Sequence, residues 1–506
     1  MPRPTAAIAL ALIALTLAPV LALAGRVPLT LALSAPDLAA IRFTLLQALL
    51  SAAISTALAI PLARALARRR FPGRAALITA LGAPFLLPAL SAVLGLLTVF
   101  GRAGWVNAAL AALSLPPVSI YGLHGVVLAH VVFNLPLATR LILFGWAAIP
   151  AERFRLARAL DFTPAATFRH LEAPMLRGLI PGVFLTIFAI CLTSFAVALT
   201  LGGGPRATTV ELAIYQALRF DFDLPAAARL ALVQLALCTA AFLAARHLAV
   251  AAAFGAGLDR AEPPPAPPGW RAAADAAIIA LATLALALPI VAIALRGLPG
   301  LSTLPPEVWA AAARSIAVAL AAATTTLALA LPLALAAARG PALPALAATL
   351  PLATSGLALG TGLFLILNPL IRPADIALPV TVLVNALLTL PFAFRLLLPG
   401  AQALLPHDRL ARALNLGPWA RLRWVTLPRM ARPLGFAGGL AAALAMGDLG
   451  VIVLFAGEGN PTLPLIVHRL MGAFRMEAAA SAALLLMALS FALFALIDRI
   501  GRHAAP

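Results

Sequence analysis

Hydrophobic segments of about 20 residues alternate with short polar segments along the whole chain. A helix needs about 20 apolar residues to cross the roughly 30 Å hydrocarbon core of a bilayer. Backbone groups in lipid must be satisfied within the segment, so each run predicts a helix. The predicted spans lie near residues 6–24, 43–63, 75–100, 122–147, 179–201, 226–245, 272–295, 315–338, 341–369, 376–400, 433–456 and 477–497.

Composition supports the same class. Hydrophobic residues make up 63% of the chain and charged residues 10%, and the mean hydropathy is +1.04. These values exclude a soluble globular chain. We expect an all-α integral membrane protein of about 12 transmembrane helices.

The charged residues predict an orientation. All 36 basic residues are Arg, and the formal net charge is +19. A cytoplasmic N-terminus places most of them, including the basic segment 64–74, on the cytoplasmic side, as the positive-inside rule requires. An even number of spans then makes the C-terminus cytoplasmic as well. Because the Arg residues lie between spans, they indicate topology and contact with anionic lipid rather than nucleic acid binding.

The first run has two interpretations. The residues "ALA" before Gly25 resemble the cleavage site of a signal peptide. The run 272–295, however, precedes the next span of the second half by a similar distance, which favours a retained first span. Cys191 and Cys238 fall inside predicted spans, where we expect packing roles and neither a disulfide framework nor a metal cluster.

The chain contains an internal repeat. "RLARALDFTP" begins at Arg155 and "RLARALNLGP" at Arg409, which is 254 positions later. Pro174 and Pro428 continue the match at the same offset, and so do Ser194 and Asp448. Six spans in each half give both halves the same orientation, related by an axis along the membrane normal.

The repeat divides the chain into five parts. A first span and its periplasmic loop precede the other five spans of the first half, and a Pro-rich linker separates them from the second half, which has the same plan. The predicted boundaries are 1–40, 41–250, 251–271 (cytoplasmic linker), 272–309 (span and periplasmic loop) and 310–500.

A major-facilitator transporter also has parallel six-span halves. Its loop signature of Gly, Asp and Arg lies between spans 2 and 3, where segment 64–74 carries the charge but no Asp. The repeat here is strongest between spans 4 and 5 and between spans 10 and 11. That position disfavours a facilitator.

Residues 150–174 form a polar first loop, and residues 404–428 form the matching second loop. Each predicts a short helix with two Leu residues at i and i+4, followed by a second short helix that begins at Thr163-Pro164 or Gly417-Pro418. A solvated connector does not need a duplicated apolar stripe, so the pattern indicates docking. The stripe residues are Leu156, Leu160, Leu410 and Leu414.

The two loops resemble the cytoplasmic coupling loop of binding-protein-dependent ABC importer permeases, in which EAA, three residues and Gly precede I-x-L-P by nine residues. Pro174 and Pro428 stand at the family spacing, and Ala157 and Ala411 keep the second Ala. Arg155 and Arg409 replace the Glu of the motif. Asp161 and Asn415 replace its Gly, and both residue types tolerate a left-handed backbone. The resemblance implies that the loops contact an ATPase.

Three further segments are similar to the thiamine and thiamine pyrophosphate importer permeases: 121–136, 201–218 and 447–455. This resemblance implies two type-1 importer halves that move thiamine, and with it thiamine phosphates, across the bacterial inner membrane by alternating access. It also implies two copies of a cytoplasmic ATPase, which hold ATP-Mg, a periplasmic thiamine-binding protein, and no cofactor in this chain. Fused ferric-iron permeases have the same architecture and are the alternative.

An enzyme is the rival from another class. A P-loop requires a Lys that reaches the nucleotide phosphates, and the chain contains no Lys. It also lacks metalloenzyme spacings and a GxSxG motif. We therefore expect ATP hydrolysis to reside in a separate subunit.

Polar residues inside the spans are candidates for the translocation pathway, because charge in the membrane interior is costly. Asp448 and its repeat partner Ser194 are the pathway candidates, although Asp448 could instead cap a helix break beside Gly447 or pair with an Arg. Arg140 and Arg395 are expected to snorkel to the interface, with a pyrophosphate contact as the alternative. The sequence also predicts interhelical hydrogen bonds from His124, His130 and Asn134, and a periplasmic position for 201–223.

Overall fold

The computed structural model describes most of the chain, and its described part is helical without strands. The described residues are 3–27, 33–82, 87–204, 207–248, 268–457 and 459–504. The predicted all-α membrane class is therefore confirmed. Most of the predicted linker 251–271 lies outside the described residues.

Within the described ranges, eleven helices, or twelve if one bent pair counts as a single span, are long and apolar enough to cross a membrane. This agrees with the predicted number. The helices of the eleven spans are α1 (Arg3–Ala24), α2 (Ala35–Arg68), α4 (Ala89–Phe100), α6 (Leu123–Ala147), α9 (Ala173–Leu192), α12 (Leu224–Leu248), α13 (Trp270–Gly297), α14 (Pro306–Ala337), α17 (Ala377–Ala403), α20 (Leu427–Met446) and α23 (Met476–His503).

Two predicted spans are not single straight helices. The run 75–100 divides into α3 (Arg74–Ala80) and α4, which begins directly after Pro88. The run 341–369 divides into α15 (Ala342–Thr349) and α16 (Gly356–Leu367), with a 95° bend between them. Ser355 is the N-cap of α16, because its hydroxyl accepts a hydrogen bond from the Ala358 amide at 3.1 Å. Hydropathy detects the apolar run but not the break within it.

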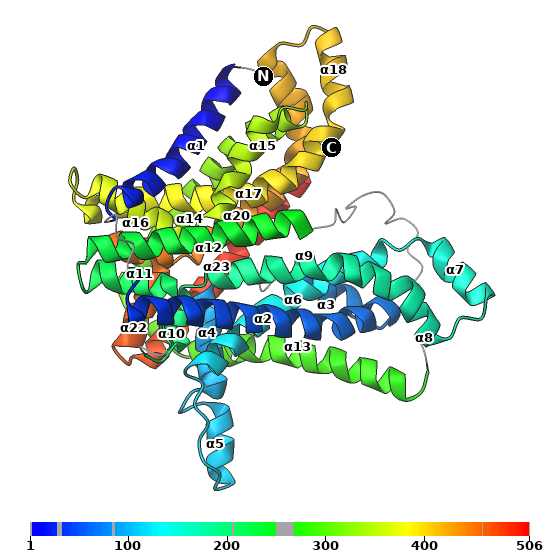
Figure 1. Ribbon diagram of the computed structural model, residues 1–506, viewed down its shortest axis with the longest axis horizontal. Helices are drawn as coiled ribbons and strands as arrows, with labels where there is room; N and C mark the ends of the chain where they lie inside the picture. The colour runs from blue at the N-terminus through cyan, green and yellow to red at the C-terminus, as the bar shows by residue number, and fades with distance from the viewer. Residues whose placement is uncertain are drawn as a thin grey trace.

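The first helix of each half packs against the opposite half. Helix α1 lies along α15 and α16, and α13 lies along α4 and α2 (Figure 1). The same residue types meet at both crossings. A side chain at Gly95 of α4 would overlap the backbone carbonyl of Pro289, and one at Gly362 of α16 would overlap that of Pro19. Glycine is required at both positions because the helix backbones approach so closely.

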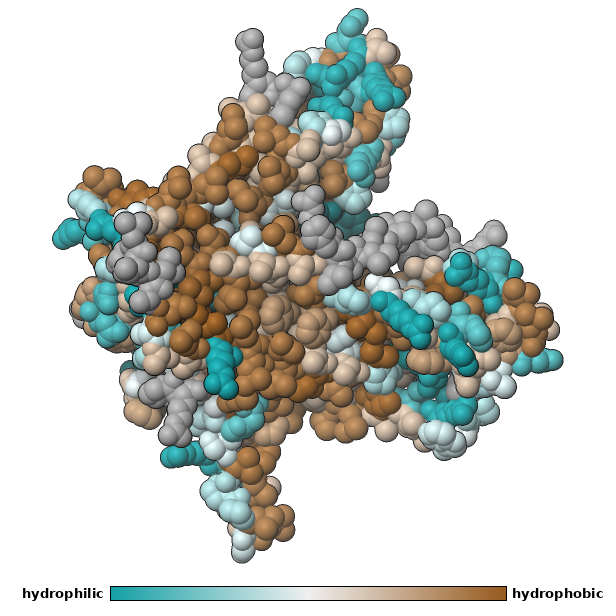
Figure 2. Space-filling model, viewed as in Figure 1, coloured by the Kyte–Doolittle hydropathy of each residue, from teal (hydrophilic) through white to brown (hydrophobic). Residues whose placement is uncertain are grey.

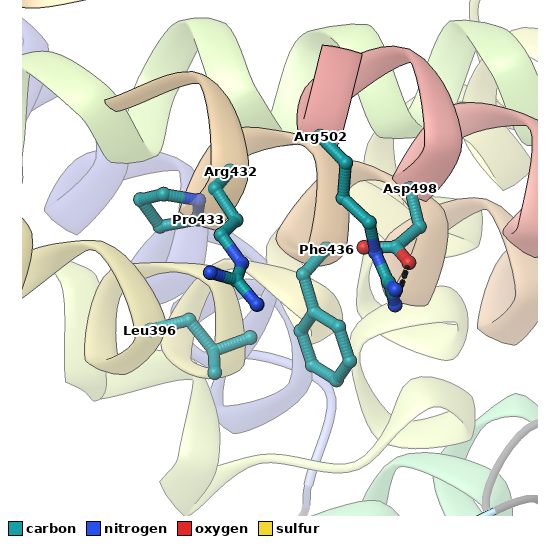
Figure 3. A pocket seen from close by; sticks show the side chains of 6 residues that line it. All are labelled: Leu396, Arg432, Pro433, Phe436, Asp498 and Arg502. Carbon is teal, nitrogen blue, oxygen red and sulfur yellow. Dashed lines mark ion pairs between the residues drawn. The ribbon is translucent and has the colours of Figure 1, made fainter. Parts of the chain in front are cut away.

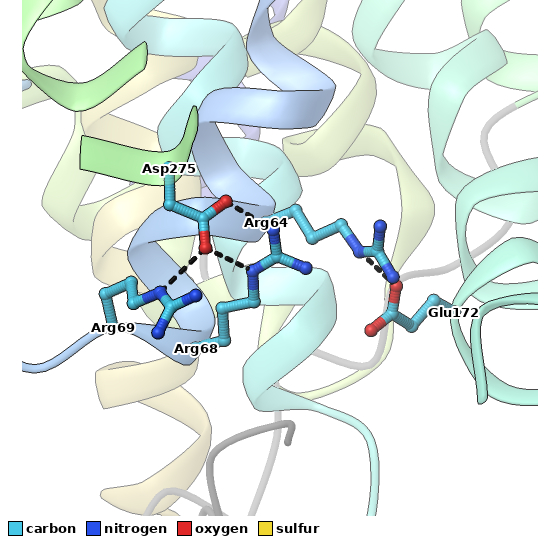
Figure 4. A network of polar contacts seen from close by, with 5 residues as sticks. All are labelled: Arg64, Arg68, Arg69, Glu172 and Asp275. Carbon is cyan, nitrogen blue, oxygen red and sulfur yellow. Dashed lines mark hydrogen bonds and ion pairs between the residues drawn. The ribbon is translucent and has the colours of Figure 1, made fainter. Parts of the chain in front are cut away.

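A polar network joins the end of α2 to its neighbours (Figure 4). Asp275 of α13 is 2% exposed and accepts hydrogen bonds at 2.7 Å from the Nε atoms of Arg68 and Arg69. Arg64 forms an ion pair with Glu172, which precedes α9, at 2.6 Å. A buried carboxylate needs such partners, so this network holds the beginning of α13 against the first half.

Side chains are apolar along the middle of the long helices and hydrophilic near their ends. Apolar residues cover the middle of the face in Figure 2, and hydrophilic residues gather around α7 (Ala151–Ala159), α8 (Pro164–Thr167) and α18 (Leu405–Ala413) at the ends of the helices. This distribution fits a chain that crosses a bilayer and places its two repeated loops in water.

Candidate functional site

The two loops have the same structure. In the first loop, α7 and α8 are followed by the π-helical turn η2 (Phe168–Glu172), which leads into α9. In the second loop, α18 and α19 (Pro418–Arg421) are followed by the π-helical turn η8 (Leu422–Thr426), which leads into α20. All these elements begin and end at the 254-residue offset of the sequence repeat. The repeat in sequence is therefore a repeat of backbone conformation.

The turn between the two short helices of each loop is left-handed. Asp161 has a φ of 51° and Asn415 a φ of 53°, as expected for residues that replace the Gly of the family motif. The amide of Phe162 donates to the carbonyl of Ala157 at 2.9 Å, and that of Leu416 to the carbonyl of Ala411 at 3.0 Å. These bonds satisfy the last carbonyls of α7 and α18, as in other helices that end in a left-handed residue.

The predicted apolar stripes lie on the surface. The exposed fractions are 60% for Leu156, 58% for Leu160, 61% for Leu410 and 66% for Leu414. The same leucine positions are therefore exposed in both loops.

The remaining predicted loop residues divide between two roles. Ala157 and Ala411 are each 3% exposed, so the small side chain lets both short helices pack closely on the bundle. Pro174 is exposed and Pro428 half-buried at the beginnings of α9 and α20.

The exposed apolar surface of the second loop is larger than the sequence reasoning indicated. Trp419 is 71% exposed and Trp424 69%. In the first loop, Phe168 is 37% exposed. These aromatic residues could have been recognised in the sequence, because they stand within polar loops.

The two loops are attached to the bundle in different ways. Phe154 of α7 is fully buried among apolar side chains. The residue at the same position of α18 is Asp408, which pairs with Arg339 at 3.0 Å, with Arg412 at 2.8 Å and with Arg421 at 3.6 Å. At this position the first loop is thus held by apolar packing and the second by ion pairs, and the first loop is also tied to α2 by the Arg64–Glu172 ion pair at its end.

The environment of Asp408 favours its charged form. Partial burial would raise the pKa of this carboxyl, but the hydrogen bond from Arg339 and the charges of Arg412 and Arg339 outweigh it and lower the pKa below its ordinary value. The second loop therefore keeps its ionic attachment at neutral pH.

Ser194 lies in a chain of hydrogen bonds. Nε2 of His130 is 2.7 Å from the Ser194 hydroxyl, and Nδ1 is 3.3 Å from the Ser51 hydroxyl. Ser194 stands at the break between α9 and α10 (Ala196–Leu201). The expected interhelical role of His130 is confirmed, because it joins α6 to α2 and to this break.

Asp448 occupies the corresponding break between α20 and α21 (Gly450–Phe455). Its carboxylate accepts a hydrogen bond at 3.3 Å from the side-chain amide of Asn385 on α17. Backbone amides at the start of α21 also hydrogen bond to it, so the expected helix cap is present. Its side chain is half-buried, and no ion pair of Asp448 with an Arg is found among the described residues.

The other predicted polar residues behave differently from one another. Asn134 of α6 donates to Sγ of Cys191 on α9 at 3.4 Å, which is interhelical as expected. His124 contacts the carbonyl of Ser119 at 2.5 Å. The interhelical prediction was wrong for His124, because this residue lies at the first turn of α6 and bonds within the preceding loop. Cys191 and Cys238 are free and buried, and Arg395 is exposed.

The segment predicted to be periplasmic contains a packed helix. Helix α11 (Val210–Arg219) contacts α12, α16, α2 and α21, and Glu211 within it is 1% exposed. Among the described residues of this segment, the large exposed hydrophobic side chains lie at its end: Phe220 is 66% exposed and Phe222 78%. The buried carboxyl of Glu211 was not singled out from the sequence, where it appears as one polar residue in an apolar run.

A cavity of about 380 Å³ lies between α17, α20 and α23 (Figure 3). Leu396, Pro433 and Phe436 form its apolar wall, and Asp498 pairs with Arg502 at 2.5 Å. Arg432 also lines it. Sixteen residues of helix, about 24 Å, separate Arg432 from Asp448, so this basic cavity is distinct from the helix break.

No group of three or more His, Cys, Asp or Glu residues that could hold a metal ion occurs within the described ranges. The described residues offer two loops with exposed apolar side chains and two polar helix breaks.

Comparison with known proteins gives one consistent result. The thiamine transport system permease protein ThiP of Salmonella typhimurium is 38% identical over 487 residues, which cover 92% of this chain and 89% of that protein. ThiP of Brucella abortus is 39% identical over 446 residues (86% and 82%), and ThiP of Haemophilus influenzae is 32% identical over 449 residues (84% and 82%). No family model matches the chain.

Proposed function

Because the chain belongs to the family of thiamine transport system permeases, we propose that it is the membrane-spanning subunit of an ATP-driven thiamine importer. The observation that carries this proposal is the similarity over 92% of the chain, which includes both loops and both helix breaks. Substrate moves by alternating access of the two halves. Thiamine is favoured over ferric iron because the relatives that match 84–92% of the chain are thiamine transport system permeases.

The two loops bind the ATPase. Each presents two exposed leucines on a short helix whose other face is packed on the bundle, so a rigid apolar surface is offered to a partner. A copy of the ATPase on each loop moves α9 and α20, which follow the loops directly. ATP and its Mg²⁺ are held by the ATPase, and this chain needs no cofactor of its own.

The helix breaks at Ser194 and Asp448 form part of the pathway. Both lie at the same place in the two repeats, each with a polar partner on the preceding span: His130 for Ser194 and Asn385 for Asp448. Asp448 is the acidic member of the set, and its half-buried carboxylate suits the cationic thiazolium of thiamine. A thiamine phosphate carries the same ring, so phosphate esters are accepted at this position as well.

The remaining parts of the system follow from this role. A periplasmic thiamine-binding protein delivers substrate to the ends of the spans opposite the loops. The chain resides in the bacterial inner membrane with both termini in the cytoplasm, on the side of the loops and of most Arg residues.

The substrate is tested with the cognate binding protein. Calorimetry with thiamine, thiamine pyrophosphate and ferric iron as separate titrants identifies the ligand that the system delivers. We expect tight binding of thiamine and no heat with ferric iron. Tight binding of ferric iron and none of thiamine would assign the permease to iron import.

A further inference from the structure

A hairpin of residues 101–122 projects from the first half between α4 and α6 and consists of one helix followed by an irregular return segment. It contains α5 (Trp105–Ala112) and returns to the bundle at Gly122, whose amide donates to the carbonyl of Leu201 at 2.8 Å. Figure 1 shows that α5 lies crosswise to the long helices α2, α9, α12 and α13. The corresponding segment of the second half, between α16 and α17, has only the single turn η7 (Pro373–Asp375).

Hydrogen bonds within the hairpin hold it together. The side-chain amide of Asn107 donates to the carbonyls of Gly101 at 2.8 Å and Val118 at 2.9 Å, and its oxygen accepts from the Val118 amide at 2.8 Å. Asn107 itself is 5% exposed. Ser114 turns the chain with a φ of 55°, and the amides of residues 113–115 bond back to α5. Its main polar groups are thus paired internally, which an apolar environment requires.

The surface of the hairpin beyond Arg102 is uncharged and exposes several large apolar side chains. No Asp, Glu, Lys or Arg occurs between Arg102 and Arg140. Among the large hydrophobic side chains of the hairpin, Leu113 is 69% exposed, Val118 58% and Leu115 50%. A projection into water normally carries charge at its tip, and this one carries none. Such an exposed patch marks contact with another apolar phase.

The base of the hairpin fixes its depth. Trp105 and Ala103 line a cavity of about 290 Å³ together with Leu295 and Arg296 of α13. Leu295 is 60% exposed on a helix whose spanning window is only 17% buried, which identifies the lipid-facing side of α13. Trp105 and Arg296 line this cavity together, and aromatic residues favour the membrane interface.

We propose that the α5 hairpin lies in the lipid leaflet at the end of the spans opposite the two loops, with Leu113, Leu115 and Val118 among the acyl chains. In Figure 2 one side of this projection is brown and joins the apolar face of the bundle, while its other side is pale teal. The occupant of the exposed patch is thus phospholipid, which anchors the first half in the leaflet. Only the naming of this leaflet as the outer one rests on the proposed function.

The test uses fluorescent labels. Cysteine is introduced by Leu113→Cys or Val118→Cys and labelled with an environment-sensitive fluorophore in the full chain, reconstituted into phosphatidylethanolamine–phosphatidylglycerol vesicles. The native Cys191 and Cys238 are buried, so the unsubstituted protein provides the labelling blank. Phe222→Cys, at a residue 78% exposed in the loop after α11, is the matched control.

The hairpin labels should be quenched by nitroxide-bearing lipid and protected from aqueous iodide, while the control label shows the opposite behaviour. Iodide quenching of the hairpin labels as strong as that of the control would overturn the proposal. A change in the hairpin signal only when the binding protein is added would also overturn it and assign the surface to protein docking. Because these substitutions are at exposed positions, the labelled proteins should remain monodisperse.

Discussion

Replacing one stripe leucine in each loop, by Leu160→Asp together with Leu414→Asp, should release the ATPase and leave the membrane bundle intact. Both side chains are more than half exposed, at 58% and 66%, so neither supports the fold of the isolated chain. Their apolar area is free to be buried in a partner. The substitution therefore acts on the interface alone.

The expected loss can be worked out from these exposures. Full burial of a leucine side chain is worth about 1.5–3 kcal/mol, so the exposed three-fifths of each contributes about 1–2 kcal/mol. Two such contacts give about 2–4 kcal/mol, which corresponds to a roughly 30- to 700-fold weaker assembly. A carboxylate that must lose its hydration at the interface increases the loss further.

Copurification and titration of the ATPase against the permease in nanodiscs measure the effect. Leu370→Asp is the matched control, because Leu370 is 76% exposed in the turn after α16 and lies outside both loops. The control should retain ATPase, and both variants should elute as the unsubstituted protein does. ATPase affinity and uptake unchanged in the double variant would refute the assignment of the loops as coupling elements.

Three other substitutions test neighbouring parts of the account. Asp408→Asn should weaken ATPase stimulation through the second loop. Because the pKa of Asp408 is lowered in the folded state, its carboxylate should stabilise the fold from neutral pH down to the unfolded pKa of about 4, and this stabilisation should be lost as the pH falls through the folded pKa. Thermal unfolding measured against pH tests this expectation. Asp448→Asn keeps a polar side chain at the helix break but removes the charge, so thiamine uptake should fall while ATPase binding, measured by copurification, is unchanged. Asn415→Gly should be neutral or slightly stabilising, whereas Asn415→Val should cost about 1–2 kcal/mol because a β-branched residue resists the left-handed turn; the midpoint of thermal unfolding distinguishes the two.

Much of the fold could be predicted from local sequence. Hydropathy located the spans because each is long enough to cross the bilayer. The offset between Arg155 and Arg409 located the two loops, and the residue types at Asp161 and Asn415 predicted the left-handed turns, which are set by local backbone sterics. These features depend on neighbouring residues along the chain.

Features that depend on long-range packing could not be predicted. The first helix of each half, α1 or α13, packs against the other half through close backbone contacts such as that of Gly95 with Pro289. The periodicity of the sequence does not reveal such contacts. The 95° bend before α16 lies inside an apolar run, and hydropathy averages over it. The bond between His130 and Ser194 joins residues 64 positions apart, so the sequence could name the participants but not the pair.

Thiamine import with energy delivered through the two loops requires the permease, an ATPase and a binding protein together. Uptake of radiolabelled thiamine into proteoliposomes is measured with each of these three components omitted in turn. We expect accumulation that requires ATP and all three components and is lost in the Leu160→Asp, Leu414→Asp variant. Uptake by this chain alone, driven by an ion gradient without ATP, would contradict this expectation.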